Sequence, residues 1–367
     1  MIDPHTFAEF FAGIGCARVG FGASWRCQFA NDIDAGKALI YWRNHGDDHF
    51  RLCDVRHNRA DDVPTVDLAM ASPPCTDLSE AGARAGIYAE RSGVVWPFIG
   101  ILRELRDQHR APKLAVVENV RGMVNGRDGR DVIAVVEALS GASYAVGAVL
   151  IDAAWFVPQS RPRVFLIAVR GDLVIPDALR GDRPTPWCST DALVKALDGR
   201  VTWWPALPLP TASPTALETC FDAKATGWIP MAPSDFGKPS RHAIERLNGD
   251  RRLGTVFRRT RNEGPVWELR LDGRAGALRV ASGGSSRQSW ALIEGGQVAR
   301  RLFTPKECAR IMGLPDGFWL PPGNDGLTAV GDGISPPVVR HLAEHLFEPI
   351  LATDSRVPIM EDLGATP

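Results

Sequence analysis

Short apolar runs alternate with longer amphipathic stretches through the first 170 residues, and each apolar run ends in Gly, Pro or Asn. This rhythm is typical of strand–helix–strand units, because unbroken apolar strands need helices on both faces of a parallel sheet. The predicted strands are Thr6 to Phe10, Trp25 to Ala30, Val66 to Ala71, Leu114 to Glu118, Tyr144 to Ile151 and Arg163 to Val169, with helices expected at 94–106 and 130–140. The pattern predicts an α/β fold with a doubly wound, Rossmann-like sheet.

The composition changes at Pro176, from which ten prolines, Pro176 included, interrupt about 65 residues that show little periodicity. Proline interrupts both helices and strand ladders, so this composition predicts a second, smaller domain that is irregular or rich in β-strands. Helical character returns after Arg300, where residues 304–307 read as a capping box with Pro305 at the first helical position.

The 42 Lys and Arg residues balance 43 Asp and Glu, so the whole chain carries no field that attracts a polyanion. The sequence contains no run of 18 apolar residues, the length needed to span a bilayer, and the chain starts without the features of a secretory signal. The seven cysteines include no Cys-x-x-Cys pair, which argues against a structural zinc site and a disulfide framework. We expect a cytoplasmic, monomeric protein without membrane contact or bound metal.

A local basic patch lies between Arg241 and Arg261, where seven Arg and two acidic residues give a net charge of +5. Arginines bind phosphates and bases stack on aromatic rings, so the patch and the tryptophans around it predict a nucleic-acid surface. A solvated charged face is at least as common an interpretation of such a run. The candidate contacts are Arg241, Arg251, Arg252, Arg258, Arg259 and Arg261.

Two glycines follow the first predicted strand, in Gly13-Ile14-Gly15. Such glycines let a nucleotide-like ligand approach the backbone, although a tight strand-to-helix connection has the same pattern. Asp32 stands 17 residues after Gly15, where an acid accepts both hydroxyls of a ribose, and Asp54 is placed to accept from an adenine amino group. Each acid alone is more often a cap or turn residue.

Reactive and charged side chains follow three further apolar runs. Cys75 comes directly after two prolines that hold it at the carboxyl edge of the sheet, where open α/β sheets bind ligands. We interpret the other six cysteines as small buried hydrophobic residues. Glu118 and Asn119 end another strand, and a buried carboxylate without a partner is costly. Alternation sends Arg161 and Arg163 to one face, where they could hold a phosphate or polarise a carbonyl.

Six sequence blocks, taken in their order along the chain, resemble those of the DNA (cytosine-5)-methyltransferases. The resemblance covers nearly the whole chain apart from about residues 180–298. The blocks are Phe-Ala-Gly-Ile-Gly at 11–15, Pro-Pro-Cys at 73–75, Glu-Asn-Val at 118–120, Gln-x-Arg-x-Arg at 159–163, and the segments 301–316 and 331–339. The resemblance implies a catalytic domain in 1–178 that 299–350 completes, a target-recognition domain in 179–298, and a tail in 351–367.

The resemblance implies transfer of a methyl group from S-adenosyl-L-methionine to carbon 5 of a cytosine flipped out of double-stranded DNA. Carbon 5 is a poor nucleophile, so a thiolate first adds to carbon 6 and produces an enamine. Cys75 matches that nucleophile, and Glu118 matches the carboxylate that contacts ring nitrogen 3 and the amino group. Asn119 would orient the Pro-Pro-Cys loop, and Arg163, with Arg161 nearby, would bind the cytosine carbonyl or flanking backbone.

The family pattern also carries over to a cofactor site and to DNA contacts. Phe11 would lie against the adenine, Asp32 would bind the ribose and Asp54 the adenine amino group. The other implied cofactor residues are Gly13, Ile14, Gly15, Ile33, Val55 and Pro74, the last near the sulfonium. The implied DNA contacts are Ser79, in the loop expected to close over the target, and Gln159.

The chain departs from the usual family pattern at several positions. Glu9 replaces an Asp, Cys16 replaces a Gly, and Thr76 replaces the Gln that commonly follows the nucleophile. Asp332-Gly333 stands where Asn-Ser or Asn-Ala is frequent, beside a cofactor contact near Gly331. The Ser-Pro-Pro-Cys-Thr-Asp-Leu-Ser segment at 72–79 and the Gly-Asp-Gly segment at 331–333 resemble phage-borne or solitary members of the family.

Three other interpretations compete with this one. His341 and His345 match the His-x-x-Glu-His pattern of some metallopeptidases, but no third ligand is evident and a solvated helix face is preferred. A subgroup of the family methylates RNA with the same blocks, although its recognition region is shorter than the one here. A catalytically silent relative that only binds DNA would have lost Cys75 or Glu118, and both are present.

Overall fold

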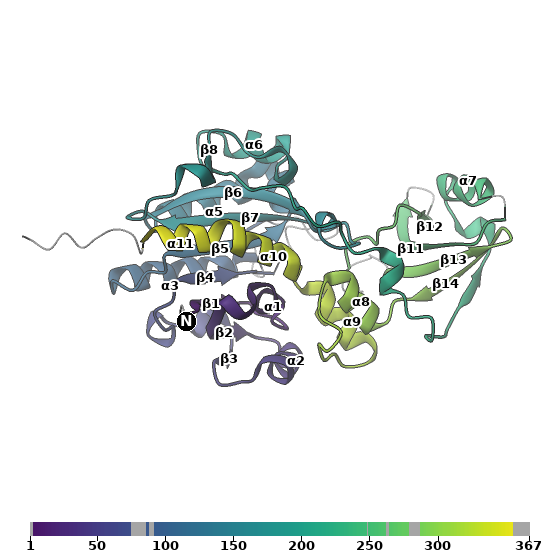
Figure 1. The fold of residues 1–367 in the computed structure, drawn as a ribbon, viewed down its shortest axis with the longest axis horizontal. Helices are drawn as coiled ribbons and strands as arrows, with labels where there is room; N and C mark the ends of the chain where they lie inside the picture. The colour runs from purple at the N-terminus through teal and green to yellow at the C-terminus, as the bar shows by residue number, and fades with distance from the viewer. Residues whose placement is uncertain are drawn as a thin grey trace, which may run out of the picture.

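The computed structural model describes residues 3–74, 86–87, 92–247, 249–261, 264–278 and 287–354. Within these ranges, a seven-stranded sheet and a five-stranded sheet stand apart from each other, with α8 (Pro305–Met312) and α9 (Gly323–Asp332) between them (Figure 1). None of the helices in these ranges is both long and apolar enough to cross a membrane.

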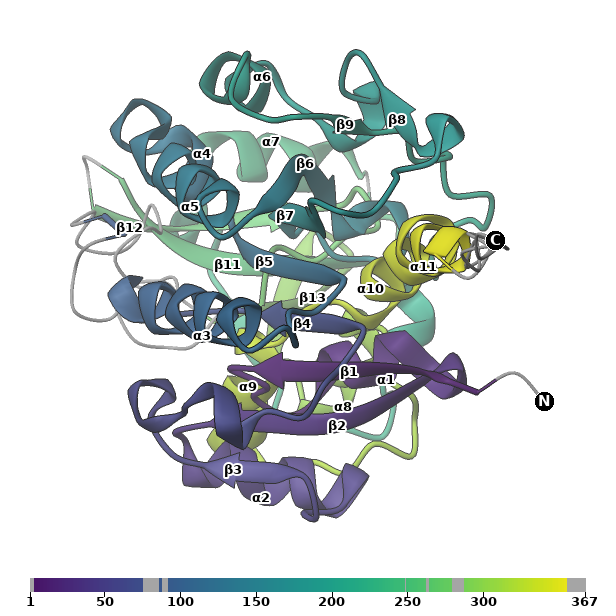
Figure 2. The same cartoon turned by 90° about the vertical axis from the view of Figure 1, so that its left-hand side faces the viewer.

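The seven-stranded sheet has the order β3-β2-β1-β4-β5-β7-β6, and its strands rise in this order in Figure 2. Its members are β1 (His5–Phe10), β2 (Trp25–Asp32), β3 (Phe50–Leu52), β4 (Leu68–Ala71), β5 (Leu114–Val120), β6 (Tyr144–Asp152) and β7 (Pro162–Arg170). All six predicted strands are present. The prediction of parallel pairing is wrong for one strand, because β7 runs antiparallel to both β5 and β6.

Helices cover both faces of this sheet, as its apolar strands require. One face carries α3 (Val95–Asp107), α4 (Gly122–Asn125), α5 (Arg130–Ser140) and α6 (Asp191–Leu197). The other face carries α1 (Cys16–Phe21), α2 (Ala35–His45), α10 (Pro336–Leu342) and α11 (Glu348–Asp354). Helix α10, from the C-terminal part of the chain, packs directly on α1.

The five-stranded sheet is antiparallel, in the order β10-β14-β13-β11-β12. Its strands are β10 (Ile229–Met231), β11 (Arg252–Arg261), β12 (Gly264–Arg270), β13 (Ser289–Glu294) and β14 (Gln297–Leu302). Helix α7 (Lys238–Arg246) packs on one face through a small apolar cluster that includes Phe236, Ile244 and Val256. The expected smaller, β-rich domain is thus present.

The predicted start of that domain at residue 179 is wrong. The two-stranded ladder of β8 (Arg180–Gly181) and β9 (Trp204–Pro205) lies against the first domain, because Trp203 and Trp204 are buried in its core. The Trp203 indole N–H donates to the Ala145 carbonyl at 3.3 Å, and its ring leaves no room for a side chain at Gly147. Proline-rich chain can follow a surface when large side chains anchor it. The second sheet itself extends from β10 to Leu302, beyond the predicted end at 298.

Candidate active site

The carboxyl ends of β1, β2, β4 and β5 meet at one edge of the seven-stranded sheet, because these strands are parallel. Strand β7 starts at the same edge because it runs in the opposite direction, and Arg163 pairs in register with Val120 at the end of β5. Most of the predicted catalytic and cofactor residues therefore gather at this edge. Cys75 and Ser79, which follow β4, lie outside the described residues.

Glu118 and Arg163 form an ion pair at this edge, with 3.1 Å between Arg163 Nε and Glu118 Oε1. Only 7% of Glu118 is exposed. Burial raises the pKa of Glu118, while Arg163, Arg161 and the Ser72 hydroxyl oppose the shift without cancelling it. A carboxyl group in this setting can hold a proton at a higher pH than usual and donate it to a ring nitrogen.

Asn119 connects the end of β5 to the segment after β4. Its side-chain amide donates to the Pro73 carbonyl at 3.2 Å, and its side-chain oxygen accepts from the Val120 N–H at 2.8 Å. Both ends of this side chain are therefore fixed, and the amide is buried. The contact holds Pro73, and Pro74 beside it is exposed at the edge of the sheet.

The turn after β1 has three residues with positive φ, at Phe11 (58°), Gly13 (55°) and Gly15 (80°). A Cβ at Gly15 would lie 2.4 Å from His45 Nε2, whereas a Cβ at Gly13 would meet nothing within 4 Å. Gly15 is thus required by packing, and Gly13 leaves an open surface beside the backbone. Ile14 between them is buried in the core.

Asp32 ends β2 and is oriented by the glycine turn. Its Oδ2 accepts the Gly13 N–H at 2.8 Å, and its Oδ1 accepts the Asp34 N–H at 2.9 Å. Each carboxylate oxygen can accept a further hydrogen bond, so two ligand hydroxyls can still be bound. The next residue, Ile33, is 66% exposed, which leaves an apolar side chain open to a ligand next to Asp32 in the chain.

The remaining predicted cofactor residues differ in how open they are. Asp54 is held by Arg56, whose hydrogen bonds lower the pKa of the carboxyl group. The Val55 side chain is buried in the core, where its 3₁₀ turn meets α3. Phe11 is partly buried against the same core.

The predicted roles of Gln159 and Arg161 are corrected by their contacts. Gln159 is completely buried: its amide donates to the Ile311 carbonyl, and its oxygen accepts the Leu278 N–H. It therefore cannot contact DNA in this arrangement. Arg161 is also buried, and its guanidinium donates to three backbone carbonyls, those of Leu278, Gly331 and Gly333. Both residues fasten the return and recognition segments to the first domain, which a short motif does not reveal.

The arginines of the basic patch do not share one surface. Val256 of β11 packs under α7, so alternation places Arg252 and Arg258 on the α7 face and Arg259 on the opposite face. Arg259 forms an ion pair with Glu268, 3.7 Å apart. Arg241 is exposed on α7, and Arg251 is exposed just before β11. Of Arg261, the structure describes only the backbone at the end of β11.

Six cysteines are described, and all are free. Burial raises the pKa of each thiol, to about 12 for Cys16, Cys27 and Cys188 and to about 11 for Cys220, with upward shifts also at Cys53 and Cys308. A thiol in this state supplies little thiolate near neutral pH.

The interpretation of His341 and His345 as a solvated face is wrong for His341. Its ring is buried, contacts the Pro208 carbonyl at 3.1 Å and packs against Trp187. Across the described part of the chain, no three His, Cys, Asp or Glu side chains come together as metal ligands.

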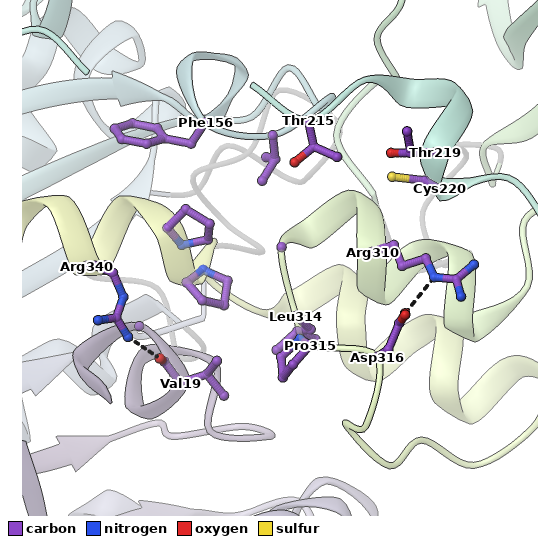
Figure 3. A pocket seen from close by; sticks show the side chains of 15 residues that line it. Val19, Phe156, Thr215, Thr219, Cys220, Arg310, Leu314, Pro315, Asp316 and Arg340 are labelled. Carbon is purple, nitrogen blue, oxygen red and sulfur yellow. Dashed lines mark hydrogen bonds and ion pairs between the residues drawn. The ribbon is translucent and has the colours of Figure 1, made fainter. Parts of the chain in front are cut away.

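A cavity of about 560 Å³ opens between α1, α10 and α8 (Figure 3). An ion pair between Arg310 and Asp316 crosses one side, and Arg340 reaches the Val19 carbonyl on the other. The residues that line it include none of the predicted site. Two residues at the predicted site were missed: the Ser72 hydroxyl beside Glu118, and Lys37, whose partner Asp332 stands where an amide is frequent.

Comparisons with known proteins identify relatives of this chain. The chain is 23% identical to the Type II methyltransferase M.BsuFI of Bacillus subtilis, covering 96% of this chain and 75% of that protein. It is 25% identical to M.NlaX of Neisseria lactamica, covering 95% and 98% respectively. A crystal structure of Spodoptera frugiperda DNMT2 shares the fold, with a TM-score of 0.60, 17% identity, and coverage of 93% of this chain and 98% of that one.

A family model described as C-5 cytosine-specific DNA methylase matches residues 5–348, which is nearly the whole chain. The match includes the glycine turn, the end of β5, the start of β7 and the return segment. The chain therefore belongs to the C-5 cytosine-specific DNA methylase family and is a DNA (cytosine-5-)-methyltransferase.

Proposed function

We propose that this enzyme methylates cytosine in a specific double-stranded DNA sequence, with S-adenosyl-L-methionine as the donor and Cys75 as the covalent nucleophile. The observation that carries the proposal is the Glu118–Arg163 pair, which lies beside a Pro73 carbonyl held by Asn119. Cys75 follows two residues later in the sequence. The Type II methyltransferases among its bacterial relatives support a role in restriction–modification, in the cytoplasm.

The donor fits the residues at the glycine turn. An uncovered Gly13, an exposed Ile33 and an Asp32 with free acceptor capacity suit a ribose and an adenine ring. Phe11, Gly15, Asp54 and Pro74 complete the proposed site. S-adenosylmethionine, when bound, supplies an electrophilic methyl group on a sulfonium.

The chain's own residues prepare the base. The protonated Glu118 carboxyl donates to ring nitrogen 3, which withdraws electrons from carbon 6. The Cys75 thiolate then forms a bond to carbon 6, and carbon 5 becomes nucleophilic. After carbon 5 has accepted the methyl group, water removes the carbon 5 proton, the bond between the Cys75 sulfur and carbon 6 breaks, and the proton on nitrogen 3 returns to Glu118. Arg163 holds Glu118 and faces the cytosine carbonyl, whereas Arg161 positions the neighbouring segments.

A duplex that contains 5-fluorocytosine at the target tests the covalent step. Fluorine cannot leave carbon 5 as a cation, so the enzyme–DNA bond persists after methyl transfer. The wild type should form a complex that survives denaturing electrophoresis, Cys75→Ala should form none, and Glu118→Gln should form it at least about a hundredfold more slowly. Cys188→Ser removes a buried thiol and should behave as the wild type. A trapped complex with Cys75→Ala would overturn the nucleophile assignment.

A second measurement separates the remaining alternatives. Label from the methyl-labelled donor should enter duplex DNA and not tRNA. Transfer to tRNA alone would overturn the proposed substrate, and DNA binding without any transfer would identify a catalytically silent relative. Bisulfite sequencing of DNA from cells that express the protein would then identify the recognised sequence.

A further inference from the structure

An ion pair joins two elements beside the glycine turn. Lys37 lies in the first turn of α2 and Asp332 is the last residue of α9, with 2.7 Å between Nζ and Oδ2. Burial alone would lower the pKa of Lys37, but Asp332, Asp32 and Asp34 outweigh it and the net shift is upward. The carboxylate of Asp32, the proposed ribose-binding residue, is thus among the charges that favour the ammonium form of Lys37.

The backbone around Asp332 is held on both sides. Arg161 donates to the Gly331 carbonyl at 3.0 Å and to the Gly333 carbonyl at 2.6 Å. A Cβ at Gly333 would lie 2.6 Å from Cys16 Sγ, the first residue of α1. Cys16 thus fills the space that a larger residue at 333 would need. Two departures from the family pattern are parts of one packed contact, and this contact constrains the backbone next to Asp332.

The charges at this place are unbalanced without Lys37. Asp32, Asp34 and Asp332 each contribute a carboxylate, and Lys37 forms an ion pair with Asp332 while the other two carboxylates also favour its charged form. An ammonium group has three donors, and one hydrogen bond to Asp332 leaves two for another acceptor. The amino-acid end of the proposed donor carries a carboxylate, which an unpaired Asp332 would repel.

We propose that Lys37 binds the α-carboxylate of the methyl donor and that Asp332 positions Lys37 for this contact. The proposal rests on the donor assigned above. It explains why a carboxylate is tolerated where the family frequently has an amide: the extra negative charge is matched by a cation from α2.

Binding calorimetry with two ligands tests it without turnover. S-adenosylhomocysteine carries the amino-acid end, and 5′-methylthioadenosine lacks it. Lys37→Met should weaken S-adenosylhomocysteine binding by about tenfold or more and methylthioadenosine binding by less than about twofold. Asp332→Asn, which keeps an acceptor for Lys37, should stay within about threefold of the wild type for both ligands. Lys195→Met, on the exposed surface of α6, is the matched control and should change neither.

The double variant gives the decisive comparison. Lys37→Met with Asp332→Asn should bind S-adenosylhomocysteine more tightly than Lys37→Met alone, because the uncompensated carboxylate is gone. Equal weakening of both ligands by Lys37→Met, or a double variant no better than the single one, would overturn the proposal. Lys37→Gln, which can still donate to Asp332, gives the same test if the Met variant does not fold. A wild type that binds neither ligand nor S-adenosylmethionine would instead overturn the donor assignment.

Discussion

The two sheets of this enzyme differ in whether their charged side chains are buried with fixed partners or exposed to solvent. In the seven-stranded sheet, helices seal both faces, and Glu118 and Asp32 stand at strand ends with fixed partners. In the five-stranded sheet, α7 covers part of one face, and Arg258 and Arg259 project from neighbouring positions to opposite sides. A buried charged side chain needs a partner, and the partner fixes its position. An exposed charged side chain is stabilised by water and can adopt several positions.

Arg301 breaks this division, because it is a sealed charge on the second sheet. Its guanidinium, at the end of β14, bonds both oxygens of Glu307 at 3.0 and 2.7 Å, and the side chains are 3% and 0% exposed. Arg301→Met would leave the Glu307 carboxylate buried without its cation. We expect a loss of about 3–5 kcal/mol in the free energy of unfolding, measured by urea denaturation.

The control for Arg301 is Arg310, which lies on the same helix as Glu307. Arg310 pairs with the exposed Asp316, so Arg310→Met should leave the urea midpoint nearly unchanged. Equal effects of the two substitutions would show that burial does not separate these two ion pairs.

A second prediction concerns Glu9, whose carboxyl group is buried in the seven-stranded sheet. Burial, reinforced by Asp32 and opposed by Arg18, raises the pKa of Glu9 from 4.5 to about 8. Between these values the folded state holds a proton that the unfolded chain releases, so stability falls as pH rises. The slope from this group is at most about 1.4 kcal/mol per pH unit, or about 2 kcal/mol between pH 6 and 8. Glu9→Gln should remove it in thermal unfolding across this range, and parallel profiles for both proteins would contradict the assignment.

A third prediction concerns Gln159, whose buried side chain joins the first domain to segments that follow it in the chain. Gln159→Leu leaves the Leu278 N–H and the Ile311 carbonyl without this partner, so we expect a loss of about 1–2 kcal/mol in unfolding free energy. Gln297→Leu, at an exposed position of β14, should change stability by less than about 0.5 kcal/mol. Reduced DNA affinity with unchanged stability at Gln159 would restore it as a DNA contact.

The sequence predicted the sealed sheet well because burial leaves a strong signal. Unbroken apolar runs predicted the six strands, and polar residues at their ends predicted the edge where Asp32 and Glu118 lie. The direction of β7 leaves no such signal, yet it brings Arg163 to Glu118.

The pattern of apolar and polar residues could not predict contacts between segments that lie far apart in the sequence. Arg161 meets carbonyls 170 and 172 residues later in the chain, and nothing local distinguishes these acceptors from a substrate. The sequence also did not show that the arginines of β11 lie on two faces, because that depends on which face of the strand is packed: Val256 lies under α7, and Thr255 pairs with Trp290 on the other face.

The smallest predicted effect concerns the open sheet, and it asks which face meets DNA. Thr255 and Arg259 lie on the side of β11 opposite α7, and Trp290, which pairs with Thr255, belongs to the core shared with the first domain. We proposed that the enzyme acts on a specific DNA sequence, and DNA that contacts both domains would meet the second sheet on this face, so this is the face we expect it to meet. Arg259→Gln should reduce the slope of log affinity against log salt concentration by about 1, measured by fluorescence anisotropy with the target duplex. Arg258→Gln, its neighbour on the α7 face, should leave the slope unchanged. The reverse result would place DNA on the α7 face, and equal losses would mean that the exposed arginines act as a diffuse field and not as a surface.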